Sequence, residues 1–189
     1  FDDDAFLVAK ELEIALTSRE MGKGQRIPLA GIPYHALDGY LAKLIRKGHR
    51  VAICEQISSP TSSKEIIERE VVRVVTPGTF LETGFLEHDT NNYLAAVFLK
   101  EQTVGLAYVD ITTLEFATSQ FDISQLDMEL NRLSPTEILV PELQKYISIL
   151  DPESVTTLKP EIFESVRARK VLLAHFRVLS LEAFGCEAL

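Results

Sequence analysis

The segment from Arg26 to Gln56 constrains the fold more than any other part of the chain. After a proline-bounded apolar run, apolar residues recur at three- and four-residue steps, which is typical of a helix with one buried face. Gly48 follows where a glycine ends a helix, and the apolar run Val51–Cys54 comes directly after it. We expect a compact unit of helix, turn and buried strand, in which Cys54 is a buried thiol. The helix positions expected to face a core are Leu37, Tyr40, Leu41, Leu44 and Ile45.

The opposite side of this helix is basic. Its row of cations has helical spacing, so the side chains share one face. Two interpretations remain open: a solvated back of the helix, or a stripe that faces phosphate groups. The row consists of Lys43, Arg46, Lys47 and Arg50.

Charge is divided unevenly along the 189 residues, which carry a formal net charge of −9. Residues 1–78 hold 11 basic and 11 acidic residues, whereas residues 79–189 hold 8 basic and 17 acidic ones. If either half binds DNA, we expect it to be the first. The acidic second half is better suited to binding protein.

Cys54 and Cys186 stand far apart and in no metal-binding spacing, so nothing indicates an oxidising compartment. No apolar run approaches the roughly 18 residues that a membrane span requires. We therefore expect a cytoplasmic protein without membrane contact. Because the chain begins with Phe, we interpret it as part of a longer protein.

The first quarter contains a candidate DNA-contacting loop. An acidic run, Asp2–Asp4, precedes an apolar stripe and predicts a helix start, since negative charge is favourable there. Ser18–Gln25 is polar, contains two glycines and is flanked by Arg19 and Arg26. Such a loop suits contacts to a phosphate backbone, although a plain solvated connection has the same composition.

Further along, Lys64–Glu70 is expected to form a short helix and Val71–Val75 a β-branched strand, followed by a turn at Thr76–Thr79. The second half then predicts an antiparallel meander of three strands and an alternation of helices and strands. This layout resembles a ribonuclease-H-like domain, and the overall fold class is mixed α/β. The expected strands are 93–99, 104–109, 114–118, 137–141 and 155–158, and the expected helices are 123–133, 143–150 and those within 161–176.

That layout raises a catalytic alternative, because nucleases of this fold hold two metal ions with convergent carboxylates. The candidates are Asp110, Glu115, Asp127 and Glu129. However, Asp110 begins an Asp-Ile-Thr-Thr turn, where an aspartate commonly caps its own backbone. The chain contains no P-loop, no G-x-S-x-G and no H-E-x-x-H motif.

Several long motifs resemble the MutS family of bacterial DNA mismatch-repair proteins. They are PLAGIPYHALDGYLAKLIRKGHRVAICEQ, VVRVVTPGT, NNYLAA, GLAYVDITTLEF and FGCE, and they follow one another in order. The family's stacking phenylalanine belongs to a GDFYE stretch, which this sequence does not contain, so Phe1 is not that residue.

The resemblance implies a division into four parts: a mismatch-recognition domain (1–75), a linker (76–90), a ribonuclease-H-like connector domain (91–178) and the start of a core region (179–189). The first part would touch the DNA backbone through Thr17, Arg19, Lys23, Gly24 and Arg26.

For function, the resemblance implies a protein that binds mispaired double-stranded DNA and couples this binding to ATP-dependent signalling. The connector would dock a MutL-type protein, and the parent protein would be a homodimer. ATP and Mg²⁺ would bind in the parent, so we expect neither a cofactor nor an enzyme active site in this piece. The two alternatives are a metal-dependent nuclease that uses Asp110 and a plain protein-interaction module.

Overall fold

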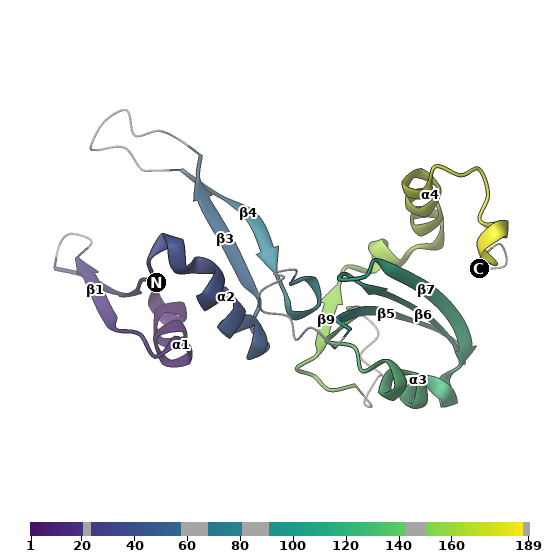
Figure 1. The fold of residues 1–189 in the computed structure, drawn as a ribbon, viewed down its shortest axis with the longest axis horizontal. Helices are drawn as coiled ribbons and strands as arrows, with labels where there is room; N and C mark the ends of the chain where they lie inside the picture. Colours follow the sequence, from purple (N-terminus) through teal and green to yellow (C-terminus); the bar gives the residue numbers. More distant parts are fainter. Residues whose placement is uncertain (21–23, 58–67, 81–90, 143–149, 187–189) are drawn as a thin grey trace. The chain divides into compact units, whose positions relative to one another are not determined.

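The chain forms two units, Phe1–Thr90 and Asn91–Leu189, in the computed structural model. Both contain helices and β-sheet, which confirms the predicted mixed α/β class (Figure 1). None of the described helices is long and apolar enough to cross a membrane. The structure describes residues 1–20, 24–57, 68–80, 91–142 and 150–186.

The first unit combines two α-helices with two separate antiparallel strand pairs, β1–β2 and β3–β4. The three aspartates expected at a helix start lie in the first turn of α1. In chain order the elements are α1 (Asp2–Leu12), β1 (Leu16–Glu20), β2 (Arg26–Ala30), η1 (Tyr34–Ala36), α2 (Leu37–Arg46), β3 (Val51–Gln56), β4 (Arg69–Val75) and η2 (Pro77–Thr79).

Helix α2 follows the sequence prediction closely. Leu41, Leu44 and Ile45 are buried, so the apolar stripe does face a core. Gly48 has φ +82°, and its N–H donates to the carbonyl of Ile45 at 2.9 Å, which ends the helix. Val75 and Phe80 belong to the same buried core as Leu41 and Ile45 of α2.

The expectation that Cys54 is buried is wrong, because its side chain is exposed on β3. A two-stranded sheet has only one face that α2 can cover, and the valines Val71, Val72 and Val74 of β4 are also more than half exposed. The apolar run was correctly interpreted as a strand, but the run alone did not reveal that this strand has an exposed face.

Two boundaries also differ from expectation. Ser18–Glu20 belongs to β1 rather than to a loop, and Arg69 and Glu70 belong to β4 rather than to a helix. Polar side chains form strands here because backbone pairing in an exposed hairpin does not require burial on either face.

The second unit is built on one five-stranded sheet with the order β7-β6-β5-β8-β9. β5, β6 and β7 pair antiparallel, which confirms the meander, while β8 and β9 add in parallel. The helix expected at 143–150 falls almost wholly outside the described residues. The elements are β5 (Tyr93–Lys100), β6 (Thr103–Asp110), β7 (Glu115–Asp122), η3 (Ile123–Gln125), α3 (Leu126–Leu133), β8 (Glu137–Pro141), β9 (Val155–Leu158), η4 (Pro160–Phe163), α4 (Ser165–Phe176) and η5 (Glu182–Phe184).

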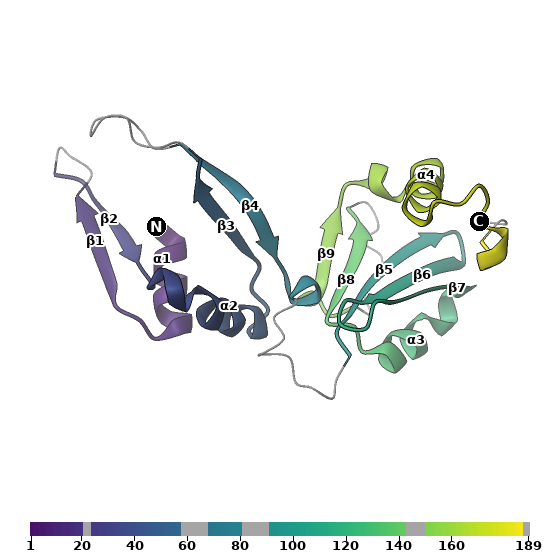
Figure 2. The same ribbon diagram turned by 45° about the horizontal axis from the view of Figure 1, so that its top comes forward.

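The core of this unit lies between the sheet and α3. Leu126 and Leu133 of α3 pack against Ala95 and Val97 of β5, and all four are nearly inaccessible to solvent. Figure 2 shows α3 on this side of the sheet and α4 on the other. No residue of α4 is buried, so the second face of the sheet is only partly covered.

The predicted linker begins at Thr76, but its first residues pack with the first unit. Thr76 and Thr79 form a reciprocal cap on η2, and the side chain of Phe80 is 4% exposed. The rest of that linker, 81–90, lies outside the described residues. The four-part division of the chain therefore stays a prediction.

Candidate nucleic-acid interface

The β1–β2 hairpin places the two predicted arginines on opposite faces. Arg19 pairs with Ile27, whereas Arg26 pairs with Glu20 in the adjacent row. Directly paired residues share a face and neighbouring rows alternate, so Arg19 and Arg26 project to opposite sides. Both are exposed and both lie next to the turn. The structure thus brings the two cations to one end of a ribbon without placing them side by side.

The other three predicted contact residues have different positions. Thr17 donates its hydroxyl to the carbonyl of Leu29 at 2.9 Å, so it ties the two strands together. Gly24 has φ +75°, a conformation that favours glycine, and it closes the turn into β2. Lys23 lies outside the described residues. Thr17 and Gly24 therefore have structural roles within the hairpin. The side chains of Arg19 and Arg26 are exposed and can contact DNA.

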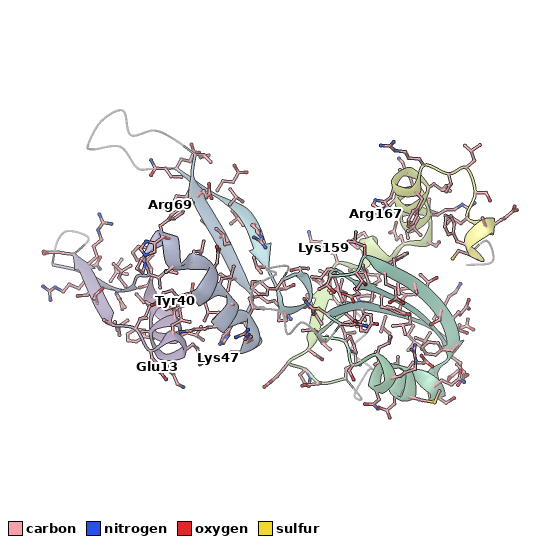
Figure 3. All side chains as sticks on the ribbon, viewed as in Figure 1. Glu13, Tyr40, Lys47, Arg69, Lys159 and Arg167 are labelled. Atoms are coloured by element: carbon pink, nitrogen blue, oxygen red, sulfur yellow. The ribbon has the colours of Figure 1, made fainter. Side chains whose placement is uncertain are left out.

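Part of the basic row on α2 is occupied within the protein. The ammonium group of Lys47 lies 2.8 Å from the carboxylate of Glu11 and donates to the Glu11 carbonyl at 2.7 Å. The Lys43 ammonium lies 5.4 Å from the ring centroid of Tyr40. Lys47, labelled in Figure 3, therefore joins the end of α2 to the last turn of α1. This contact favours a structural role for Lys47 over the phosphate-facing interpretation.

Two exposed arginines that the sequence analysis did not select lie on β4. They are Arg69, labelled in Figure 3, and Arg73, which pairs with Ile53. Arg73 interrupts a β-branched run, and a cation within such a run is the signal that would have identified it, whereas Arg69 stands two residues before the run. They add positive charge to a second hairpin of the same unit.

The geometry around Asp110 does not favour the catalytic alternative. Its Oδ1 accepts from the N–H of Thr112 at 2.9 Å and from the Thr112 hydroxyl at 2.6 Å, so the carboxylate caps its own turn. Burial raises the pKa of Asp110, and the hydrogen bonds from Thr112 and Thr113 lower it by more, so the pKa lies below its ordinary value. A group that stays charged and engaged in this way is typical of a structural aspartate.

The other carboxylates do not converge on Asp110. Glu129 pairs with Arg132 at 2.8 Å, and Asp127 is exposed on α3. Glu115 pairs directly with Asp110 in the sheet register but is exposed. Within the described parts of the chain, no group of three or more His, Cys, Asp or Glu side chains could hold a metal ion.

Comparison with known proteins identifies both units. Residues 1–84 match the family model described as MutS domain I, and residues 92–189 match MutS domain II. Together the two matches cover nearly the whole chain.

Curated relatives agree with these matches. The chain is 50% identical over 188 residues to a protein of Dehalococcoides mccartyi strain CBDB1 named DNA mismatch repair protein MutS, covering 99% of this chain and 22% of that relative. Proteins of the same name from Halothermothrix orenii and Methanosarcina mazei are 41% and 44% identical, over 99% and 100% of this chain and 22% and 23% of theirs. The chain thus spans about a fifth of the length of these relatives.

Proposed function

Because the chain belongs to the MutS family and carries its domains I and II, we propose that it forms part of a protein that binds mispaired duplex DNA and couples this binding to ATP-dependent signalling. In this proposal the first unit supplies backbone contacts to DNA, and the second unit connects the DNA-binding part to the rest of the protein. The names of the relatives support the process, DNA mismatch repair.

The geometry of the β1–β2 hairpin is the main support for the proposed DNA-binding role. A two-stranded ribbon is narrow enough to enter the major groove of B-DNA. Arg19 and Arg26 project from its opposite faces, so each can meet a phosphate on a different strand bordering the groove. Arg69 and Arg73 on β4 add a second cationic element. Phosphate contacts of this kind orient a protein without reading sequence.

We further propose that these contacts alone do not distinguish a mismatch. The sequence contains no GDFYE stretch, and contacts of its exposed cations to phosphate carry no direct sequence information. Affinity should then lie in the non-specific range, with Kd of about 10⁻⁴ to 10⁻⁶ M at physiological salt.

The test is a fluorescence-anisotropy titration of a duplex with one G·T mismatch and its matched control, each at two salt concentrations. We expect equal affinities that fall with salt. Arg19→Ala and Arg26→Ala should each weaken binding to both duplexes and reduce the salt slope by about one. Lys159→Ala, an exposed cation of the second unit, is the matched control and should change nothing.

Two results would contradict this assignment. A tenfold preference for the mismatch, equivalent to about 1.4 kcal/mol, would mean that this chain reads the lesion itself. Unchanged binding in both arginine variants would remove the hairpin from the interface.

The remaining functions are assigned to the parent protein. We propose that ATP and Mg²⁺ bind in the roughly four-fifths of the relatives' length that this chain does not span. We also propose that the parent is a homodimer and that the second unit docks a MutL-type protein. The net charge of the second unit, with 8 basic and 14 acidic residues between 91 and 189, favours docking of protein over DNA.

A further inference from the structure

The two edges of the five-stranded sheet differ in how they are protected. β9 has four residues, and Lys159 and Pro160 follow it at once. Short length, lysine and proline are the features that keep a sheet edge from pairing with another chain. One edge of this sheet therefore carries the usual protection.

The opposite edge, β7, lacks those features. It has eight residues, Glu115–Asp122, and every one pairs with β6 in a continuous register without a bulge. It contains no lysine, arginine or proline, and all its residues except Ala117 and Phe121 are exposed. Among the described residues, β6 is the only strand that pairs with β7. One row of its backbone N–H and C=O groups is thus not paired with any described strand. The contacts of the C-terminal segment to β7 that the structure describes are between side chains, from Cys186 to Thr118 and from Phe176 to Phe116.

We propose that the β7 edge binds an extended segment of a partner protein that has basic residues at both ends. Such a segment would add to the sheet as a sixth strand, with backbone hydrogen bonds supplying affinity and alternate side chains supplying selectivity. The inference concerns a surface of the second unit and does not depend on DNA binding by the first.

The charges of β7 are the reason to expect basic residues at both ends of the partner segment. Its central six residues are uncharged, whereas Glu115 and Asp122 at the two ends are acidic and exposed. Lysine or arginine opposite each end of β7 would meet an opposite charge. The acidic excess of the unit would favour the same partner.

The same pattern disfavours a second copy of this chain on the edge. In an antiparallel pair of two β7 strands in full register, Glu115 of one copy would face Asp122 of the other at both ends. In a parallel pair, each carboxylate would face its own counterpart. Like charges directly opposite one another destabilise a strand pair, so the edge is better matched by a different chain.

The test uses the full 189-residue chain and three fluorescein-labelled peptides with one shared core of alternating valine and threonine. The first carries two lysines at each end and the second two glutamates at each end. The third carries the lysines but is N-methylated at every backbone nitrogen of its core, so it keeps the charge and has no free N–H on either edge with which to add a strand. We expect the first to bind at least tenfold more tightly than either of the others, and to slow amide hydrogen exchange within residues 115–122.

A charge-reversal pair locates the contact. Glu115→Lys should weaken binding of the lysine-ended peptide at least threefold, whereas Glu153→Lys makes the same change away from β7 and should have no effect. The proposal is overturned if the N-methylated peptide binds as well as its parent, if hydrogen exchange slows elsewhere instead, or if β7 becomes protected by self-association of the chain without peptide.

Discussion

Lys47 at the end of α2 binds Glu11 twice, through the carboxylate at 2.8 Å and through the backbone carbonyl at 2.7 Å. The carbonyl belongs to the last turn of α1, where the helix leaves such groups without an internal partner. One ammonium group therefore neutralises a side chain and caps a helix at the same time. It joins two helices that the sequence separates by the whole β1–β2 hairpin.

Replacing Lys47 by methionine should lower the free energy of unfolding, because methionine keeps most of the unbranched side chain and loses both contacts. The matched control is Lys43→Met on the same helix, where the ammonium group lies 5.4 Å from the centroid of the Tyr40 ring. Chemical denaturation of both variants checks the prediction. Equal stability of the two variants would show that the Lys47–Glu11 contact contributes nothing measurable.

The contribution of this contact should depend on pH. The hydrogen bond from Lys47 is the main cause that lowers the pKa of Glu11 below its ordinary value of 4.5. A carboxylate with a lowered pKa stabilises the folded state above its unfolded pKa, and that stability is lost as the pH falls through the folded pKa. The stability difference between the parent chain and Lys47→Met should be constant from pH 7 to about pH 5 and should shrink below 4.5. A difference that grows on acidification would contradict this sign.

Gly24→Ala should destabilise the β1–β2 hairpin. The residue has φ +75°, and a Cβ there would meet no other atom within 4 Å, so the cost is backbone strain rather than a clash. We expect a loss of about 1 kcal/mol by chemical denaturation. Gly24→Asn is the control, because asparagine tolerates this conformation better and should cost less. If alanine and asparagine cost the same, the turn does not require the left-handed conformation.

Leu106→Ala should destabilise the second unit by about 2–5 kcal/mol, because it removes a buried side chain and leaves a cavity. Leu106 is 1% exposed in the core of the sheet. Leu114→Ala makes the same substitution at a residue that is 81% exposed, and it should change stability by less than about 0.5 kcal/mol. Thermal unfolding followed by circular dichroism compares the two, and similar losses would mean that the core does not lie where α3 meets the sheet.

The correct predictions from sequence concern elements whose geometry depends on residues close together in the chain. The spacing of Leu41, Leu44 and Ile45 identified α2, and Gly48 identified its end, because helix period and a left-handed glycine are properties of adjacent residues. The Asp110 turn was predicted for the same reason. Strand alternation likewise identified the meander.

The prediction of the interface residues was less complete, because it depends on register and on the layers around each strand. No local signal determines that Arg19 pairs with Ile27. A shift of the strand register by one residue would have placed both arginines on the same face of the hairpin. The exposure of Cys54 depends on how much of β3 another layer covers, which its neighbours in the sequence do not specify. Lys47 looked like its basic neighbours on α2 until its distant partner, Glu11, was known.

The exposure of Cys54 has a practical consequence. The chain has two cysteines; both are free thiols, and they lie one in each unit, with Cys54 exposed on β3 and Cys186 partly exposed after η5. Neither lies among the residues selected for DNA contact. Spin labels or fluorophores attached to these two native thiols would report the distance between the two units in solution, and how this distance changes when DNA or a partner is added.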